Sequence, residues 1–139
     1  MLKKQKIKER LATVQDDYQV GVFAYTGSGK VVLVTSRKGE SWILPKGNRA
    51  KKRSDRLQAK REAFEEAGLQ GSMNCKHYDF NSFEKSKNLR IFTMNVKKIL
   101  NDFPEKNQRK RMVTTFDRAE KMVKGEYLEI IRELRKKIF

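Results

Sequence analysis

The sequence is poor in the residues that bind zinc or form disulfides. Among 139 residues, Cys75 is the only cysteine and His77 is the only histidine. A disulfide within the chain is therefore impossible, and a zinc site built from histidine and cysteine would have too few ligands. A serine–histidine or cysteine–histidine nucleophile pair would have to use His77, and nothing else around it supports catalysis. We interpret both residues as ordinary members of a β-strand, on which they share one face.

The sequence also lacks an apolar run long enough to cross a bilayer. Its first residues, Met1–Arg10, are charged but are not followed by the apolar region of a signal peptide. We therefore expect no membrane partner and a cytoplasmic location. The length predicts one domain over residues 1–139, with a basic N-terminal arm at 1–11 and a C-terminal helix at 126–138. The oligomeric state is left open.

Acidic residues are scarce, because 17 Asp+Glu stand against 33 Lys+Arg and leave a formal net charge of +16. A field of this sign raises the local concentration of polyanions. Nucleic acids, nucleotide polyphosphates, inositol phosphates and acidic membrane surfaces all qualify. Within this basic chain, Glu62, Glu65 and Glu66 form an acidic island.

These three glutamates are expected on one face of a helix, because the spacing i, i+3, i+4 stacks side chains over about one turn. Such a face is either simply solvated or binds a divalent cation, since Mg²⁺ and Mn²⁺ take hard oxygen ligands. Ser54 is a typical N-cap and Gly68 a typical stop, so the helix is predicted to run to about Ala67. Its apolar face is predicted to consist of Leu57, Phe64 and Ala67 with Ala63 beside them, opposite the glutamates, and Leu57 and Phe64 are predicted to hold the helix on a sheet.

The other elements follow from apolar patterning and turn residues, with strands predicted at 17–25, 31–35, 41–44, 73–80, 89–99 and 112–115. A capping box of Asp117 with Glu120 predicts a short helix through about Val123. An apolar stripe predicts the last helix, with Tyr127, Ile130, Ile131, Leu134 and Ile138 on one face. This order predicts an α/β sandwich with a mixed sheet.

The segment Thr26–Lys30 reads TGSGK, which invites comparison with a phosphate-binding loop. The spacing of that loop would need a glycine at Ala24 and a serine or threonine at Val31, and a helix would have to follow. A β-branched strand follows instead, so the segment is predicted to be a hairpin turn.

The stretch from Gly47 to Leu69 resembles the Nudix box, GX5EX7REUXEEXGU, in which U is an apolar residue. The segment 61–69, REAFEEAGL, falls at the motif spacing without a gap, and one position departs: Arg53 stands where the motif has its first glutamate. Further segments are similar to the diphosphoinositol polyphosphate phosphohydrolase branch of this family, at 33–37, 42–47, 103–105, 109–111 and 116–119. The resemblance covers roughly Asp17 to Lys124.

The resemblance implies a Nudix fold, an α/β/α sandwich with a mixed sheet. It also implies Mg²⁺- or Mn²⁺-dependent cleavage of a phosphoanhydride in a polyphosphorylated small molecule. Diphosphoinositol polyphosphates, diadenosine polyphosphates and the 5′ ends of RNA are examples. By motif position, the metal ligands would be Gly47, through its carbonyl, with Glu62, Glu65 and Glu66. Glu65 and Glu62 would be catalytic, with Glu65 either binding metal or orienting water as a base.

Residues around the motif are implied to bind the substrate phosphates: Ser36, Arg37, Lys46, Lys85, Arg109 and Arg111. Arg53 either reaches a substrate phosphate or costs the site one metal ion. Arg61 is predicted to hold the glutamates by charge-assisted hydrogen bonds. Glu105 is a candidate base or ligand from a distant loop, and Trp42 either stacks on a base or packs in the core.

A second interpretation is a Nudix-fold module with damaged metal chemistry that binds RNA or another polyanion through its basic surface. Arg53 and the Lys/Arg runs favour this module, whereas the intact Glu62, Glu65 and Glu66 favour the enzyme.

Overall fold

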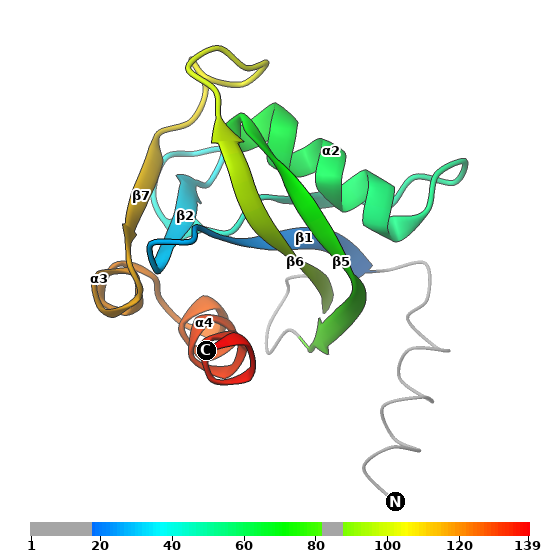
Figure 1. Cartoon of the computed structure of the whole chain (residues 1–139). Helices are drawn as coiled ribbons and strands as arrows, with labels where there is room; N and C mark the ends of the chain where they lie inside the picture. The colour runs from blue at the N-terminus through cyan, green and yellow to red at the C-terminus, as the bar shows by residue number, and fades with distance from the viewer. Residues whose placement is uncertain (1–17, 82–87) are drawn as a thin grey trace, which may run out of the picture.

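A computed structural model describes residues 18–81 and 88–139, which form a mixed β-sheet with helices on both sides (Figure 1). In chain order the elements are β1 (Tyr18–Tyr25), β2 (Lys30–Thr35), β3 (Trp42–Ile43), β4 (Lys46–Asn48), α2 (Asp55–Ala67), β5 (Leu69–Phe80), β6 (Asn88–Ile99), β7 (Arg111–Thr115), α3 (Phe116–Met122) and α4 (Glu126–Ile138). This confirms the predicted α/β class and the mixed sheet. The predicted order lacked β4, and β5 begins earlier than expected, directly after the glycine that ends α2.

The sheet is built around β1, which runs parallel to β6, while all the other strand pairs are antiparallel. The predicted hairpin turn joins β1 to β2, and the Thr26 amide donates to the Lys30 carbonyl at 2.8 Å. The two strands pair only at Tyr25 and Val31 and diverge beyond that point. Upstream of that point, Gln19–Gly21 of β1 pairs with β4 instead. This arrangement places Gly47 of β4 directly beside Val20.

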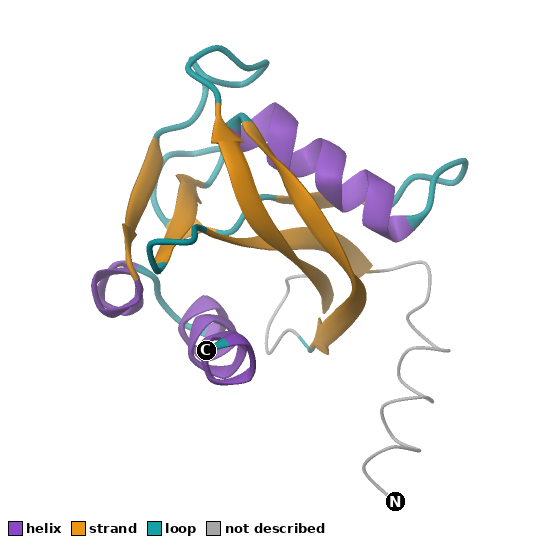
Figure 2. Cartoon of the chain, viewed as in Figure 1, coloured by secondary structure: helices purple, strands orange, loops and turns teal. Residues whose placement is uncertain are grey.

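Helices cover the two faces of the sheet, with α2 on one side and α3 and α4 on the other (Figure 2). On the α4 side, the Phe23 ring stacks on Phe116 with centroids 6.0 Å apart, and Tyr25 meets Phe139 edge-on at 5.4 Å. The predicted stripe of α4 is confirmed, since its first four members are buried and the last is partly buried: Tyr127, Ile130, Ile131, Leu134 and Ile138. Among the described residues, no helix is long and apolar enough to cross a membrane.

The predicted buried face of α2 is confirmed for Ala63 and Ala67 and is wrong for Leu57 and Phe64. Leu57 is 51% exposed and Phe64 is half-buried, whereas Ala59, Ala63 and Ala67 are completely buried. These alanines recur every fourth residue and form one stripe along the helix, and their small side chains let the backbone lie close to the sheet. The glutamates are therefore not opposite the buried face. Glu66 is itself only 3% exposed.

The predicted capping box of α3 is also wrong. Thr115 is the N-cap, with extended backbone angles, and its hydroxyl accepts from the Arg118 amide at 3.3 Å. The helix thus begins at Phe116, directly where β7 ends. Asp117 and Glu120 bind Arg135 of α4 instead, at 2.8 and 2.7 Å, and so join the two helices.

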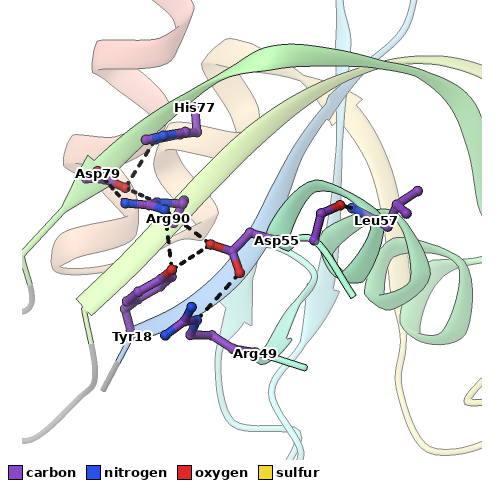
Figure 3. A network of polar contacts seen from close by, with 8 residues as sticks. Tyr18, Arg49, Asp55, Leu57, His77, Asp79 and Arg90 are labelled. Carbon is purple, nitrogen blue, oxygen red and sulfur yellow. Dashed lines mark hydrogen bonds and ion pairs between the residues drawn. The ribbon is translucent and has the colours of Figure 1, made fainter. Parts of the chain in front are cut away.

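A polar network ties the start of α2 to the sheet (Figure 3). The Tyr18 hydroxyl donates to Asp55 at 2.6 Å, and Arg90 of β6 binds both Asp55, at 3.2 Å, and Asp79, at 2.9 Å. Ser54 caps the helix as predicted, because its hydroxyl accepts from the Leu57 amide at 3.2 Å. The first turn of α2 therefore has a defined position relative to β1, β5 and β6.

Candidate active site

A cavity of about 1140 Å³ lies between α2, β4, the 105–109 loop and the start of α4. Eight of the residues implied to form the site line it: Ser36, Arg37, Lys46, Gly47, Glu62, Glu65, Glu66 and Arg109. Trp42 and Glu105 line it as well. The structure thus brings together side chains from five separate stretches of the chain. Cys75 and His77 lie on β5, as predicted, and do not line this cavity.

Glu62 and Glu66 meet against the backbone of β4. A Cβ atom at Gly47 would collide with the Glu62 carboxylate, so any other residue at this position would displace that carboxylate from the backbone of β4. The backbone amide of Lys46 lies 3.4 Å from Glu66 Oε1. The two helix carboxyls and the strand that carries the Gly47 carbonyl are therefore adjacent, as the motif implies.

The two carboxyl groups share a hydrogen bond, and their pKa values are raised. Burial, followed by the hydrogen bond to Glu62, raises the pKa of Glu66 to about 8. Burial also raises the pKa of Glu62, although its hydrogen bonds with Glu66 and Gln58 oppose the shift. Two buried carboxylates cannot both ionise this close together without a positive charge between them. A divalent cation would supply that charge.

Glu65 lies on the same helix face but has a different partner. Arg61 Nε donates to Glu65 Oε1 at 2.6 Å, which confirms the predicted charge-assisted bond for this one glutamate.

In the described part of the chain, no three His, Cys, Asp or Glu side chains are already grouped as a metal cluster. The donors nevertheless fit Mg²⁺ or Mn²⁺, because Glu62 and Glu66 converge beside a strand carbonyl and all are hard oxygen ligands.

Arg53 reaches the acidic pair through Gln58. Arg53 Nη1 donates to Gln58 Oε1 at 2.7 Å, and Gln58 Nε2 donates to Glu62 Oε1 at 3.0 Å. Gln58 is 9% exposed and lines the cavity, whereas the Arg53 side chain is exposed and does not line it. Sequence reasoning missed Gln58, and the available signal was its spacing of four residues before Glu62.

The loop that follows β6 brings Glu105 and Arg109 to the acidic pair. The Glu105 amide donates to the Glu65 carbonyl at 2.9 Å, and Arg109 Nε binds the Glu105 carboxylate at 2.9 Å. Arg109 also donates to the Thr35 carbonyl at 2.9 Å and lies 3.7 Å from Glu66. Its side chain is only 7% exposed. Arg109 therefore holds Glu105 and balances the charge of Glu66 from the wall of the cavity.

Lys46 of β4 also lines the cavity. Its ammonium donates to Gln19 Oε1 at 2.8 Å. Burial lowers the pKa of Lys46, while Glu66, Glu126 and Glu62 act against the shift. Lys46 is thus close to the acidic pair on one side and to the start of α4 on the other.

Arg111 is not in the phosphate-binding ring to which the sequence assigned it. Its Nη1 atom donates to the carbonyls of Ala67 and Leu100, both at 2.7 Å, and its guanidinium lies over the Phe103 ring. Arg111 does not line the cavity and instead satisfies a carbonyl at the end of α2. Lys85, another predicted member of the ring, lies outside the described residues.

The chain is similar in sequence to a known protein. A protein of Arabidopsis thaliana named "Nudix hydrolase 18, mitochondrial" is 32% identical to this chain over 94 residues. The match covers 65% of this chain and 53% of that protein, so the chain spans about half the length of the curated relative it matches. The similarity supports the Nudix superfamily. No protein-family model matches the chain.

The residues at the positions that resemble the Nudix box lie in two groups. Gly47, Glu62 and Glu66 come together at the proposed metal position, and Glu65 lies beside them with Arg61. Arg53, the departure from the Nudix box, stays at the edge and acts on the cluster only through Gln58.

Proposed function

We propose that this chain is a metal-dependent Nudix-type hydrolase that cleaves a phosphoanhydride bond in a polyphosphorylated small molecule. The observation that carries the proposal is the meeting of Glu62 and Glu66 beside Gly47, where the absence of a side chain leaves room for the Glu62 carboxylate. Candidate substrates are diphosphoinositol polyphosphates, dinucleoside polyphosphates and other nucleoside polyphosphates, with an RNA 5′ end as a further candidate.

The cofactor is proposed to be Mg²⁺ or Mn²⁺, held by the Gly47 carbonyl, Glu62 and Glu66. When bound, such an ion neutralises phosphate charge and lowers the pKa of a bound water. Glu65, whose carboxylate accepts a hydrogen bond from Arg61 at 2.6 Å, would serve as the base that accepts a proton from the attacking water or orients that water. We assign the binding of the substrate's phosphate oxygens to Lys46 and Arg37, because both line the cavity. Arg109 would keep Glu105 and Glu66 in position, because it binds Glu105 at 2.9 Å and lies 3.7 Å from Glu66.

The test is release of phosphate or pyrophosphate from a panel of polyphosphates in the presence of Mg²⁺. We expect turnover by the wild type, none in excess chelator, and a loss on the order of 100-fold or more in Glu66→Gln, the effect of removing one group that stabilises charge in the transition state. Glu133→Gln, an exposed residue of α4 outside the cavity, is the matched control. Wild type and Glu66→Gln that are equally inert across the panel would contradict the proposal.

The rival function, a module that binds RNA or another polyanion, is favoured by one observation. Lys51, Lys52 and Arg53 are exposed in the loop before α2, and their side chains lie outside the cavity. Such a surface would bind nucleic acid through phosphate contacts, with an affinity that falls steeply as salt rises. Tight, salt-dependent RNA binding without any metal-dependent turnover would favour the module over the enzyme.

A further inference from the structure

One buried hydroxyl group in the wall of the cavity has no hydrogen-bond partner in the described part of the chain. Tyr127 of α4 is only 8% exposed and lines the cavity. Among residues 18–81 and 88–139, no hydrogen bond reaches its hydroxyl, whereas the Tyr18 hydroxyl donates to Asp55 at 2.6 Å. A buried hydroxyl without a partner destabilises the fold, because it has given up its hydrogen bonds to water. The hydroxyl of Tyr127 therefore has a reason other than stability.

Packing does not supply that reason. Tyr127 opens the buried stripe of α4, and the other members of the stripe carry no polar side-chain atom: Ile130, Ile131, Leu134 and Ile138. A phenylalanine would fill the same place with its ring, since the two side chains differ by one oxygen atom. The core thus uses the ring, and the hydroxyl is left for the cavity.

Two backbone features place Tyr127 in the wall of the cavity. An isolated bridge joins Val123 to Trp42, so the chain approaches α4 beside β3. Gly125 then turns the backbone with a φ of 58°, and its carbonyl accepts from the Leu128 amide at 3.2 Å. Tyr127 lies in the first turn that follows. A residue of the α4 stripe therefore reaches the cavity.

Glu66 and Glu126 lie within electrostatic reach of the hydroxyl. Burial raises the pKa of Tyr127 above its ordinary value, and the charges of Glu126 and Glu66 raise it further. The same two glutamates act on the ammonium of Lys46, so the hydroxyl and Lys46 lie near the same part of the cavity. Because the phenol keeps its proton, it is a neutral hydrogen-bond donor and does not act as an acid or a base.

A phosphate oxygen is the acceptor that suits this donor. Lys46 and Arg109, two cations close to Glu66, already bind protein groups, whereas the Tyr127 hydroxyl does not. A hydrogen bond to a charged oxygen is shorter and stronger than one to a neutral acceptor. A further cation at this place would form an ion pair with Glu66 or Glu126. A neutral hydroxyl can bind phosphate and leave both carboxylates free.

We propose that the Tyr127 hydroxyl is a ligand-binding group, which donates a hydrogen bond to a phosphate oxygen of the molecule bound between α2 and α4. The ring holds the start of α4 in the core, and the hydroxyl stays unpaired until the ligand enters. The inference rests on the proposed function for the presence of a phosphorylated ligand, and it does not depend on cleavage of that ligand.

The test compares the wild type with Tyr127→Phe, which removes only the hydroxyl. The probe is methylenediphosphonate, in which a carbon atom replaces the bridging oxygen of pyrophosphate, so it binds without being hydrolysed. Isothermal titration in Mg²⁺ should show affinity at least about tenfold weaker in Tyr127→Phe, the scale of one hydrogen bond to a charged group. The matched control is Tyr78→Phe, on β5 and outside the cavity, which should bind like the wild type.

Two further measurements separate ligand binding from a structural role. Without ligand, the Tm of Tyr127→Phe should equal or exceed that of the wild type, because the substitution removes an unpaired buried hydroxyl. The Mn²⁺ affinity of Tyr127→Phe should also be unchanged, since the hydroxyl does not bind Glu66. A lower Tm together with weaker Mn²⁺ binding would show that the hydroxyl supports the protein itself, and would overturn the proposal.

The results for Tyr127 and for the hydrolase can be told apart. Equal affinity of wild type and Tyr127→Phe for methylenediphosphonate, or no binding by the wild type, would overturn the role of the hydroxyl. Weaker binding by Tyr127→Phe without hydrolysis of any polyphosphate by the wild type would support that role and contradict the hydrolase. Hydrolysis with the same kcat/KM in both proteins would do the reverse.

Discussion

Arg53 shows how one substituted residue can act at a distance. Its guanidinium donates a hydrogen bond to the amide oxygen of Gln58, and the NH₂ group of the same amide donates to Glu62. The flipped amide would place an oxygen against the carboxylate and would be repelled. Arg53 is therefore a positioning residue, which acts through Gln58 to hold Glu62 beside Gly47.

Replacing Arg53 with methionine changes the Mn²⁺ affinity in opposite directions for a pure charge effect and for a positioning role. Removing a positive charge near a cation site should by itself strengthen cation binding. If Arg53 positions Gln58, Arg53→Met should instead weaken Mn²⁺ binding about tenfold, the lower end of the effect of lost outer-shell contacts. Isothermal titration with Mn²⁺ measures it, and Lys52→Met, an exposed neighbour, supplies the pure charge effect. Unchanged or tighter binding by Arg53→Met would contradict the role.

At the scale of elements, α2 is the platform of the site because both of its ends are anchored. The network of Tyr18, Asp55 and Arg90 fixes the first turn (Figure 3). At the other end, Gly68 adopts a left-handed conformation with a φ of 65°, and Arg111 binds the Ala67 carbonyl. The glutamates in between therefore have a fixed position relative to β4.

Arg111 is expected to matter for stability. Arg111→Met removes two hydrogen bonds from a charged donor to backbone carbonyls, so the free energy of unfolding should fall by about 2–3 kcal/mol. Urea denaturation measures it. The matched control, Arg118→Met, changes an exposed side chain and should cost less than about 0.5 kcal/mol. Equal stability of the two variants, with a raised KM for Arg111→Met alone, would return Arg111 to the role of a phosphate ligand.

Local signals were sufficient to predict several elements. Ser54 and Gly68 defined α2, the apolar stripe defined α4, and the turn at Thr26–Lys30 followed from its glycines. These features depend on neighbours within a few residues. The motif spacing implied Glu62, Glu65 and Glu66, of which Glu62 and Glu66 lie against β4 while Glu65 pairs with Arg61.

Features that depend on distant contacts could not be predicted in this way. The buried face of α2 follows from how closely the helix approaches the sheet, which favoured alanines over the larger Leu57. Arg111 binds a carbonyl 44 residues earlier in the sequence. An isolated bridge joins Trp42 of β3 to Val123, the residue after α3. No periodicity or motif records such contacts.

At the scale of the whole molecule, the excess of positive charge and the site serve different tasks. The cavity lining is nearly neutral, so most of the net charge of +16 lies on the remaining surface and the undescribed segments. That surface attracts polyanions to the molecule, while the cavity selects among them.

The buried acidic pair should make stability depend on pH when divalent metal is removed. In the unfolded chain, Glu66 loses its proton near its ordinary pKa of 4.5, whereas burial in the folded protein raises that pKa to about 8. Between these values the folded state holds the extra proton, so the free energy of unfolding should fall as pH rises, by at most about 1.4 kcal/mol per pH unit. Chemical denaturation in chelator measures it. The dependence should shrink in Glu66→Gln and in excess Mg²⁺, and identical slopes for wild type and Glu66→Gln would contradict it.

The central claim is that Glu62 and Glu66 form one divalent-metal site beside Gly47. The most direct test is Mn²⁺ titration followed by electron paramagnetic resonance, in which bound Mn²⁺ loses the signal of the free ion. We predict binding by the wild type and by Glu133→Gln, and affinities at least about tenfold weaker in Glu62→Gln and Glu66→Gln. Equal Mn²⁺ binding by all four proteins, or none by the wild type, would contradict the account.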